Sequence, residues 1–214
     1  MNWKFLRPAP WLDTRAKFVA AIPHGGALLD IGSSDGQTLC HMAELRPDLR
    51  FFATDLAGNP EKYPSGCQFH RGDVLSQKFP WPDASFDAIT CMHLVEHLQD
   101  CRFLMTEVAR LLKRGGVIYF ETPHPKSLDV PSVPGSGFTL NFYDDATHIR
   151  VVTTAELAQL AHSAGLQVQA DGISRNWLFA ASYVLLVLFP AGRKKFTAYI
   201  HWLGWSAYLI ARRP

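Results

Sequence analysis

The sequence lacks the features that define several large classes of protein. Its net charge is only +2, so it has no charge excess of the kind that nucleic-acid-binding domains carry. Its four cysteines lie far apart without a CxxC pair, which argues against a disulfide framework and favours small buried thiols in a reducing compartment. The longest uncharged run, residues 176–192, includes asparagine, serine and proline and falls short of a membrane-spanning helix. No internal repeat or low-complexity linker is present, which excludes fibrous and disordered chains.

What remains is the composition of a globular chain with an uneven distribution of charge. The 214 residues are 48% hydrophobic and 19% charged, which suits one domain with a modest extension. Residues 172–214 carry six basic residues and no acidic residue, so the rest of the chain carries a net charge of −4. The C-terminal segment is therefore a basic, apolar extension of a mildly acidic body.

Short apolar runs alternate with segments of helical periodicity along most of the chain. We expect strands at residues 27–31, 50–55, 68–71, 86–91, 116–121, 166–170 and 208–211. We expect helices at residues 10–21, 38–45, 103–112 and 154–164, the third of them closed by the Gly115-Gly116 pair. This alternation predicts a doubly wound α/β fold, in which helices cover both faces of a mostly parallel sheet. We place an N-terminal helical segment at residues 1–24 and the domain at residues 25–214, with an insertion at residues 176–205 between the last two strands.

Glycines and acidic residues follow the first three expected strands. The first strand runs into the loop at residues 32–36, where Gly32 and Gly36 allow a sharp turn and a close approach of the backbone to a ligand. The second strand ends in Asp55, where a carboxylate can accept both hydroxyls of a ribose, and Asp73 follows the third strand. Ligands bind at this edge of such sheets, so the sequence predicts a nucleoside site there. The absence of a third glycine argues against a dinucleotide.

Four segments in this order resemble the motifs of class I S-adenosylmethionine-dependent methyltransferases. They are LLDIGSSDG at 28–36, Asp55 with Asp73, SFDAI and LVEHL within 85–98, and LLKRGGV at 111–117. The resemblance covers residues 25–170. The sequence is similar to the type 11 and type 23 methyltransferases and to the ubiquinone-pathway O-methyltransferases. The resemblance implies a Rossmann-like seven-stranded sheet with an antiparallel last strand. It implies S-adenosyl-L-methionine as cofactor, with Asp55 on the ribose and Asp73 near the adenine amino group. The cofactor residues that we predict are Asp30, Gly32, Ser34, Gly36, Asp55, Leu56, Asp73, Val74 and His93.

One position departs from the family pattern. Ser34 stands where these methyltransferases usually have glycine. A small side chain should still fit there.

Histidines and a glutamate gather after the expected fourth strand. His93, Glu96 and His97 lie three and four residues apart, and His124 and His148 follow from later loops at the same edge of the sheet. Imidazoles and a carboxylate can hold zinc, iron or manganese, and such a metal would lower the pKa of an acceptor hydroxyl.

The HLVEH segment also resembles the ExxEH metal motif of ubiquinone-pathway O-methyltransferases and of small-RNA 2′-O-methyltransferases, with a histidine in place of the first glutamate. His148 resembles the later metal-binding histidine of the RNA enzymes. The resemblance therefore predicts a divalent metal held by His93, Glu96, His97 and His148. The same residues match an inverted zinc-protease motif, but the context of the fourth strand explains them better.

A site without metal is the other interpretation of this cluster. Glu96 and His97 then brace the cofactor pocket, and the catalytic residues that we predict are His148 or His124 as general base, with Glu96 beside them. Asp144 and Asp145 either hold His148, Arg150 or the hydroxyls of a substrate, or they form and cap a turn.

The basic insertion offers a clue to the acceptor. Residues 177–189 are apolar on all sides, Arg193-Lys194-Lys195 follows a Pro-Ala-Gly break, and residues 196–205 are rich in aromatic side chains. Apolar and aromatic residues beside a cationic cluster are typical of segments that lie in a membrane interface. The alternatives are a cap folded over the active site and the interface of a homodimer.

Together these features predict a bacterial-type, cytoplasmic S-adenosylmethionine-dependent methyltransferase, peripheral at the inner face of the membrane if the insertion binds lipid. The acceptor is expected to be a small or hydrophobic molecule, methylated on oxygen. One alternative is 2′-O-methylation of an RNA end, which needs a basic groove. Residues 124–150 supply only Lys126 and Arg150, so nucleic acid is disfavoured. A second alternative is a non-catalytic methyltransferase-like subunit that supports a partner.

Overall fold

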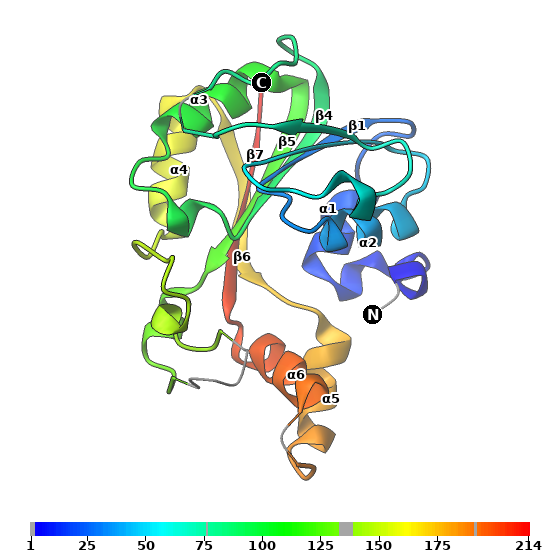
Figure 1. The fold of residues 1–214 in the computed structure, drawn as a ribbon. Coiled ribbons are helices and arrows are strands. Elements are labelled where there is room, and N and C mark those ends of the chain that lie inside the picture. The colour runs from blue at the N-terminus through cyan, green and yellow to red at the C-terminus, as the bar shows by residue number, and fades with distance from the viewer. Residues whose placement is uncertain (1–2, 76, 133–138, 191) are drawn as a thin grey trace.

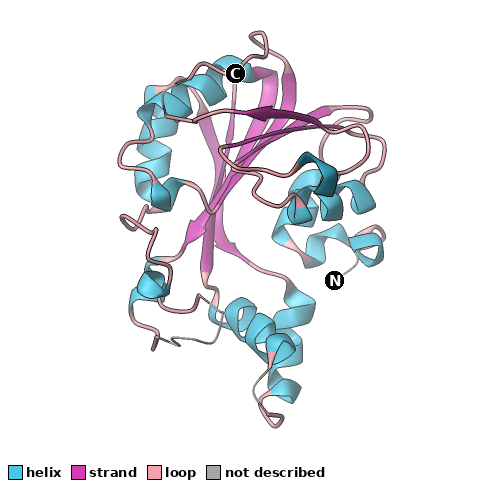
Figure 2. Ribbon diagram, viewed as in Figure 1, coloured by secondary structure: helices cyan, strands magenta, loops and turns pink. Residues whose placement is uncertain are grey.

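A computed structural model of the chain describes residues 3–75, 77–132, 139–190 and 192–214. Its strands are β1 (Ala27–Ile31), β2 (Arg50–Asp55), β3 (Gln68–Arg71), β4 (Phe86–Met92), β5 (Leu112–Pro123), β6 (Gln167–Ser174) and β7 (Ser206–Arg212). They form one sheet in the order β3-β2-β1-β4-β5-β7-β6, shown in Figures 1 and 2. The pairs from β3 to β5 are parallel, and β7 runs antiparallel to both β5 and β6. The predicted fold, including the antiparallel last strand, is confirmed.

Helices cover both faces of this sheet. The α-helices are α1 (Thr14–Ala20), α2 (Gln37–Leu45), α3 (Arg102–Leu111), α4 (Thr154–Ser163), α5 (Trp177–Leu186) and α6 (Arg193–Leu203). Short 3-10 helices are η1 (Trp3–Leu6), η2 (Pro10–Leu12), η3 (Pro60–Lys62), η4 (Val95–His97), η5 (Pro125–Leu128) and η6 (Phe142–Asp144). Figure 1 shows α1 and α2 on one side of the sheet and α3 and α4 on the other.

The central strand β1 explains why helices are needed on both faces. All five of its residues are buried, and neighbouring side chains point to opposite faces. Leu28 belongs to a core shared with α1 and α2, whereas Leu29 and Ile31 belong to a core shared with α3 and α4. An apolar run of this kind is stable as a strand only when both faces are covered.

Two predicted local structures are wrong. Helix α3 ends at Leu111, and the Gly115-Gly116 pair lies inside β5, where the pairing with β4 shifts register. Gly115 has a φ of +79°, so the pair makes an irregularity in a strand and does not cap a helix. Residues 93–97 form no α-helical face, since His93 is left-handed with φ +52° and only a 3-10 turn follows.

The strand order places the carboxyl ends of β1 and β4 side by side at the centre of one edge. Connections leave this point in opposite directions, because β2 and β3 follow β1 on one side and β5 follows β4 on the other. Such a switch point is where α/β sheets bind ligands. The loop after β1 and the segment after β4 both lie there, as the sequence predicts.

The insertion folds as a helical hairpin, α5–α6, between β6 and β7. In Figure 1 the hairpin projects beyond the end of the sheet, away from the helical layers. Its base is joined to α1, because the side chain of Asn176 donates a hydrogen bond to Asp13 Oδ2 at 2.9 Å. Among the described residues, no helix has the length and apolar character needed to cross a bilayer.

Candidate functional site

The loop after β1 is held in its shape by Asp55 at the end of β2. The Asp55 carboxylate accepts hydrogen bonds from the backbone N–H of Ser34 at 2.8 Å and of Ala57 at 2.9 Å. Ser34 has a φ of +48°, in the left-handed region where glycine is favoured. This conformation gives a physical reason why glycine would be favoured at that position.

Tyr63 closes the other side of the same loop. Its hydroxyl donates to the Ser34 carbonyl at 3.0 Å and lies 2.9 Å from the Ser33 hydroxyl. Gly36 begins α2 with a φ of +74°, and a Cβ atom there would lie 1.9 Å from the Tyr63 ring. The tyrosine therefore requires glycine at position 36.

Asp30 is the buried carboxyl group at the end of β1. It accepts a hydrogen bond from Thr90 Oγ1 on β4 at 2.7 Å. Burial raises the pKa of Asp30 to about 7, although the Thr90 hydrogen bond acts in the opposite direction. The group lies at the floor of the site and titrates near neutral pH.

A cavity of about 360 Å³ opens above these residues. Six of the predicted site residues line it: Asp30, Gly32, Ser34, His93, His97 and His148. The other predicted residues are not among those that line it: Gly36, Asp55, Leu56, Asp73, Val74, Glu96 and His124. Asp55 and Gly36 shape the loop instead, and the Leu56 side chain is 64% exposed. Asp73 accepts a hydrogen bond from the backbone of Leu75.

A buried charged network lies behind the cavity. Both ring nitrogens of His93 face carboxylates, Nδ1 at 3.1 Å from Glu96 and Nε2 at 3.2 Å from Glu121. Burial lowers the pKa of His93, but the two carboxylates outweigh it and raise the pKa to about 9. Arg15 of α1 forms a two-point ion pair with Glu121, which together with His93 holds the pKa of Glu121 well below its usual range despite burial. His93 is therefore a cation between two carboxylates.

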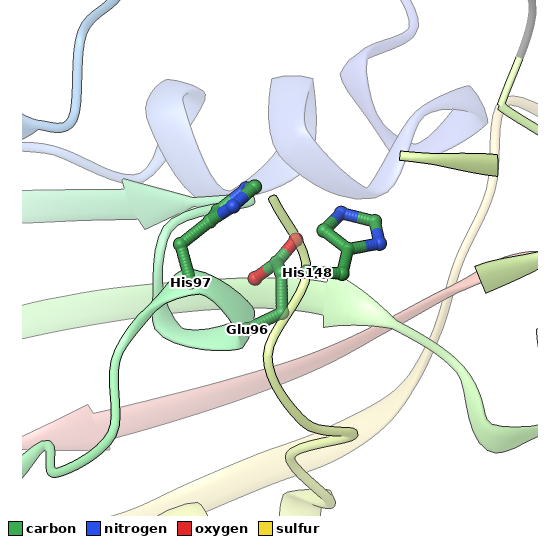
Figure 3. Close-up of side chains that lie close together, drawn as sticks. All are labelled: Glu96, His97 and His148. Carbon is green, nitrogen blue, oxygen red and sulfur yellow. The ribbon is translucent and has the colours of Figure 1, made fainter. Parts of the chain in front are cut away.

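Glu96, His97 and His148 come together across a sequence separation of about fifty residues. Each offers a ligand atom within 4.8 Å of the others, and Figure 3 shows the Glu96 carboxylate between the two imidazole rings. Glu96 is fully buried and also accepts a hydrogen bond from Thr122 at 3.3 Å. The structure thus brings three of the four predicted metal ligands together, and His93, the fourth, is outside the group.

Backbone carbonyl groups select the tautomer of both histidines. His148 Nδ1 lies 2.6 Å from the Phe142 carbonyl, and His97 Nδ1 lies 3.1 Å from the Thr147 carbonyl. A carbonyl can only accept, so each Nδ1 carries the proton and each Nε2 keeps its lone pair. Asp145 lies 3.8 Å from His148 Nε2. Its pKa is lowered, first by a hydrogen bond from Thr147, so it is an ionised neighbour of that nitrogen.

His124 has a different role in the fold. Its Nδ1 accepts the backbone N–H of Lys126 at 3.1 Å and caps η5. Burial lowers the pKa of His124, so the ring is neutral at neutral pH. The structure does not bring it into the group formed by Glu96, His97 and His148.

Sequence reasoning missed several residues of the cavity. They are Arg15, Thr38, Met92, Thr139 and Trp205, whereas Ser33 and Asp35 belong to the predicted loop at residues 32–36. Arg15 comes from the N-terminal helix and meets Glu121 across 106 residues, and the Trp205 ring lies 5.6 Å from that of His93. No local pattern could reveal these two, because their partners lie far away in the chain.

A family model and curated relatives agree on one family, and solved structures share the fold. The family model described as "Methyltransferase domain" matches residues 3–171. The chain is 33% identical to the ubiquinone biosynthesis O-methyltransferase of Albidiferax ferrireducens over 185 residues, 73% of this chain and 72% of the relative. It is 28% identical to the enzyme of the same name from Thiobacillus denitrificans over 169 residues, 74% of this chain and 70% of the relative. A SAM-dependent methyltransferase from Archaeoglobus fulgidus shares the fold with a TM-score of 0.63 at 16% identity, covering 99% of this chain and 94% of that one.

Proposed function

The chain belongs to the methyltransferase-domain family and is an S-adenosylmethionine-dependent methyltransferase, and from this premise we propose that it methylates an oxygen of a small-molecule acceptor. Two similar proteins are O-methyltransferases of ubiquinone biosynthesis. A hydroxylated aromatic acceptor is in keeping with these names.

The residues at the switch point fit the cofactor. The cavity is lined by the loop from Gly32 to Ser34 and by the Asp30 carboxyl group. Asp55 receives one backbone N–H on each carboxylate oxygen, and each oxygen keeps a lone pair for a ribose hydroxyl. We assign cofactor binding to these residues and to Gly36, Leu56, Asp73, Val74 and His93 around them. When bound, the cofactor supplies a methyl group on a positively charged sulfur.

His148 is the residue that we assign to the proton of the acceptor hydroxyl. Its Nε2 keeps a lone pair, because Nδ1 donates to the Phe142 carbonyl, and the residue lines the cavity. The ionised Asp145 at 3.8 Å stabilises the imidazolium that forms when Nε2 takes the proton. This fixed tautomer beside the cofactor loop is the observation on which the proposal rests.

The test is a methyl-transfer assay with labelled cofactor on a panel of hydroxylated aromatic compounds, with and without an apolar tail. Replacing His148 by asparagine should lower kcat about 100-fold and leave the affinity for adenosylhomocysteine unchanged. His24 is an exposed histidine outside the cavity, so His24→Asn is the matched control. Transfer to nitrogen or sulfur, or an unchanged kcat in His148→Asn, would contradict the proposal.

A second candidate, a divalent metal at the same place, is supported by the grouping of Glu96, His97 and His148. Two imidazole nitrogens and a carboxylate oxygen suit zinc, manganese or iron, and a metal there would lower the pKa of an acceptor hydroxyl. We leave His93 out of the donor set, because both of its nitrogens face carboxylates. Metal analysis of protein purified without an affinity tag, beside His97→Ala, tests this site. Equal metal content in both proteins would remove His97 as a ligand.

A further inference from the structure

The outward face of α5 is apolar and uncovered. Trp177, Leu178, Val184 and Leu185 are all exposed, as is Leu188 just after the helix. Steps of seven residues, or two helical turns, separate the first pair from the second, so these side chains lie on one side of the helix. Leu185 is 69% and Leu188 84% exposed. A contiguous apolar face of this kind is rare on a monomeric soluble protein and marks a contact surface.

The other faces of α5 are in use inside the molecule. Phe179 stacks on His201 of α6 with ring centroids 5.6 Å apart, and Tyr183 packs against Tyr199 and Trp202. The hairpin is therefore a packed unit with its own apolar contacts. The side chains on the outward face of α5 take no part in these contacts.

The tip of the hairpin is basic, although positive charge at this position destabilises helix α6. Arg193, Lys194 and Lys195 occupy the first turn of α6, where the positive end of the helix dipole disfavours cations. Lys195 has a local use, because its Nζ donates to the carbonyl groups of Val187 and Phe189 at the end of α5. Arg193 and Lys194 are exposed, and neither forms an ion pair with an acidic side chain among the described residues.

No acidic residue occurs after Asp171, so the positive charge of the hairpin has no local counter-charge in the chain. Exposed tryptophans at its base, Trp177 and Trp202, accompany this charge. An apolar face next to a cationic tip complements the acyl region and the phosphate groups of an anionic lipid surface. A helix of ten residues such as α5 is about 15 Å long, half the thickness of a bilayer core, so the hairpin would lie in the interface.

A groove of about 970 Å³ runs from the hairpin to the site. One wall is formed by the side of α5 and α6 that bears Phe179, Leu186 and Lys194, and the other by α2 and the N-terminal segment. Arg15 and Thr38 line both this groove and the cofactor cavity, so the two spaces adjoin.

We propose that the outward face of α5 and the basic tip of the hairpin dock on the surface of an anionic lipid bilayer. The groove beside the hairpin then gives an acceptor with an apolar tail a path from that surface to the cavity. This second consequence rests on the proposed methyl transfer, whereas the docking does not.

Flotation of the full chain with lipid vesicles tests the docking. The vesicles are phosphatidylcholine alone and phosphatidylcholine mixed with phosphatidylglycerol, at low and high salt. We expect flotation with the anionic vesicles, with part of it resistant to salt because apolar side chains insert. Leu185→Glu should lower the partition coefficient about tenfold or more, from the loss of a buried apolar side chain. Lys194→Glu should lower it about tenfold at low salt.

Matched substitutions outside the hairpin serve as controls. Phe103→Glu places the same charge on the exposed side of α3, and Lys62→Glu reverses a charge on η3. Both should float like the unaltered protein. All variants should bind adenosylhomocysteine with unchanged affinity, which shows that each is folded.

Three results would overturn the docking proposal. They are absence of flotation of the unaltered protein, flotation that Leu185→Glu leaves unchanged, and a dimer in vesicle-free solution that Leu185→Glu dissociates without any flotation. Binding to single-stranded RNA through Arg193 and Lys194 in place of vesicles would overturn it as well. Asp55→Ala separates the two proposals, because it should lose adenosylhomocysteine and still float.

Discussion

Two regions of the molecule depart in opposite ways from the usual rule that polar residues are exposed and apolar residues are buried. One is the edge of the sheet beside the cavity, and the other is the α5–α6 hairpin. At the cavity, charged and polar groups are buried: Asp30, Glu96 and Glu121 are almost inaccessible to solvent, and each has a hydrogen-bond partner. On the hairpin, large apolar groups such as Leu185 and Leu188 are exposed, with no covering element in the part of the chain that the structure describes.

The difference indicates what kind of partner each region takes. A buried carboxylate is costly unless it is paired or bound, so its presence marks a site where fixed charges meet a small polar ligand. An exposed apolar face is costly in water, and this cost supports our proposal that a lipid surface covers it. The two regions adjoin at Arg15, which lines both the cavity and the groove.

The largest effect is expected where the two regions meet. Glu121→Gln removes the buried charge that pairs with Arg15 and His93, and leaving these two half-buried cations without their shared partner should lower the free energy of unfolding by about 3 kcal/mol. Urea denaturation measures this loss. Glu61→Gln, at an exposed site on η3, should change it little. An equal effect in both variants would contradict the stabilising role of the Glu121 charge.

Asp55→Ala should affect only the cavity region. It removes both the acceptor for the Ser34 and Ala57 backbone groups and the predicted ribose contact, so affinity for adenosylhomocysteine should fall about 100-fold by calorimetry. The hairpin should keep its structure, because none of its described contacts involves this loop. Unchanged affinity would contradict the assignment of the cofactor pocket.

His201 should make the hairpin sensitive to pH. Burial, aided by the nearby Arg15, lowers its pKa from 6.5 to about 4, and its Nδ1 accepts the backbone N–H of Asn176. Below pH 6.5 the unfolded chain binds a proton that the folded histidine does not, so the free energy of unfolding falls as pH drops from 6.5 to 4, by about 2 kcal/mol.

The variant that checks this is His201→Asn, which keeps an acceptor and cannot titrate. Its unfolding should depend less on pH in that window, whereas the exposed His24→Asn should behave like the unaltered protein. Identical pH profiles for His201→Asn and the unaltered protein would contradict the prediction. Hydrogen exchange of the α5 and α6 amides shows whether the loss is local to the hairpin.

The smallest effects compare one glycine from each region. Gly36→Ala should destabilise the protein by about 2 kcal/mol, since the new methyl group collides with Tyr63 and the left-handed backbone disfavours it. Gly192 has no atom within 4 Å of an added Cβ and an extended φ, so Gly192→Ala should change stability by about 0.5 kcal/mol or less. Thermal melts of the two variants test this contrast, and similar values would contradict it.

The sequence predicted more of the fold than of the site. The bounds of β1, β2 and β3 match their predicted ranges, because turn residues such as glycine, proline and aspartate lie on both sides of each short strand. The prediction that the Gly115-Gly116 pair ends a helix was wrong, because two glycines suit a helix end and an irregularity in a strand equally well. Among site residues, the loop from Gly32 to Gly36 was predictable because its chemistry is local.

From the sequence, His148 could be placed only at the same edge of the sheet as Glu96 and His97. That it lies within reach of them needed the structure. Its tautomer, set by the Phe142 carbonyl, was not predictable. Hydrogen bonds of this kind depend on how a loop folds back on itself, which no pattern of residue types encodes.

The sequence by itself determined the alternation of strands and helices, the glycine loop with its acidic partners, and the basic, apolar character of residues 176–205. These features depend on residues that are neighbours in the chain, so periodicity and turn chemistry suffice to predict them. Only the tertiary structure decided that Arg15 pairs with Glu121, that Glu96, His97 and His148 meet, and that the outer side of α5 is left uncovered. Contacts of this kind join residues dozens of positions apart, and they form only once strand order and packing have placed the elements in space.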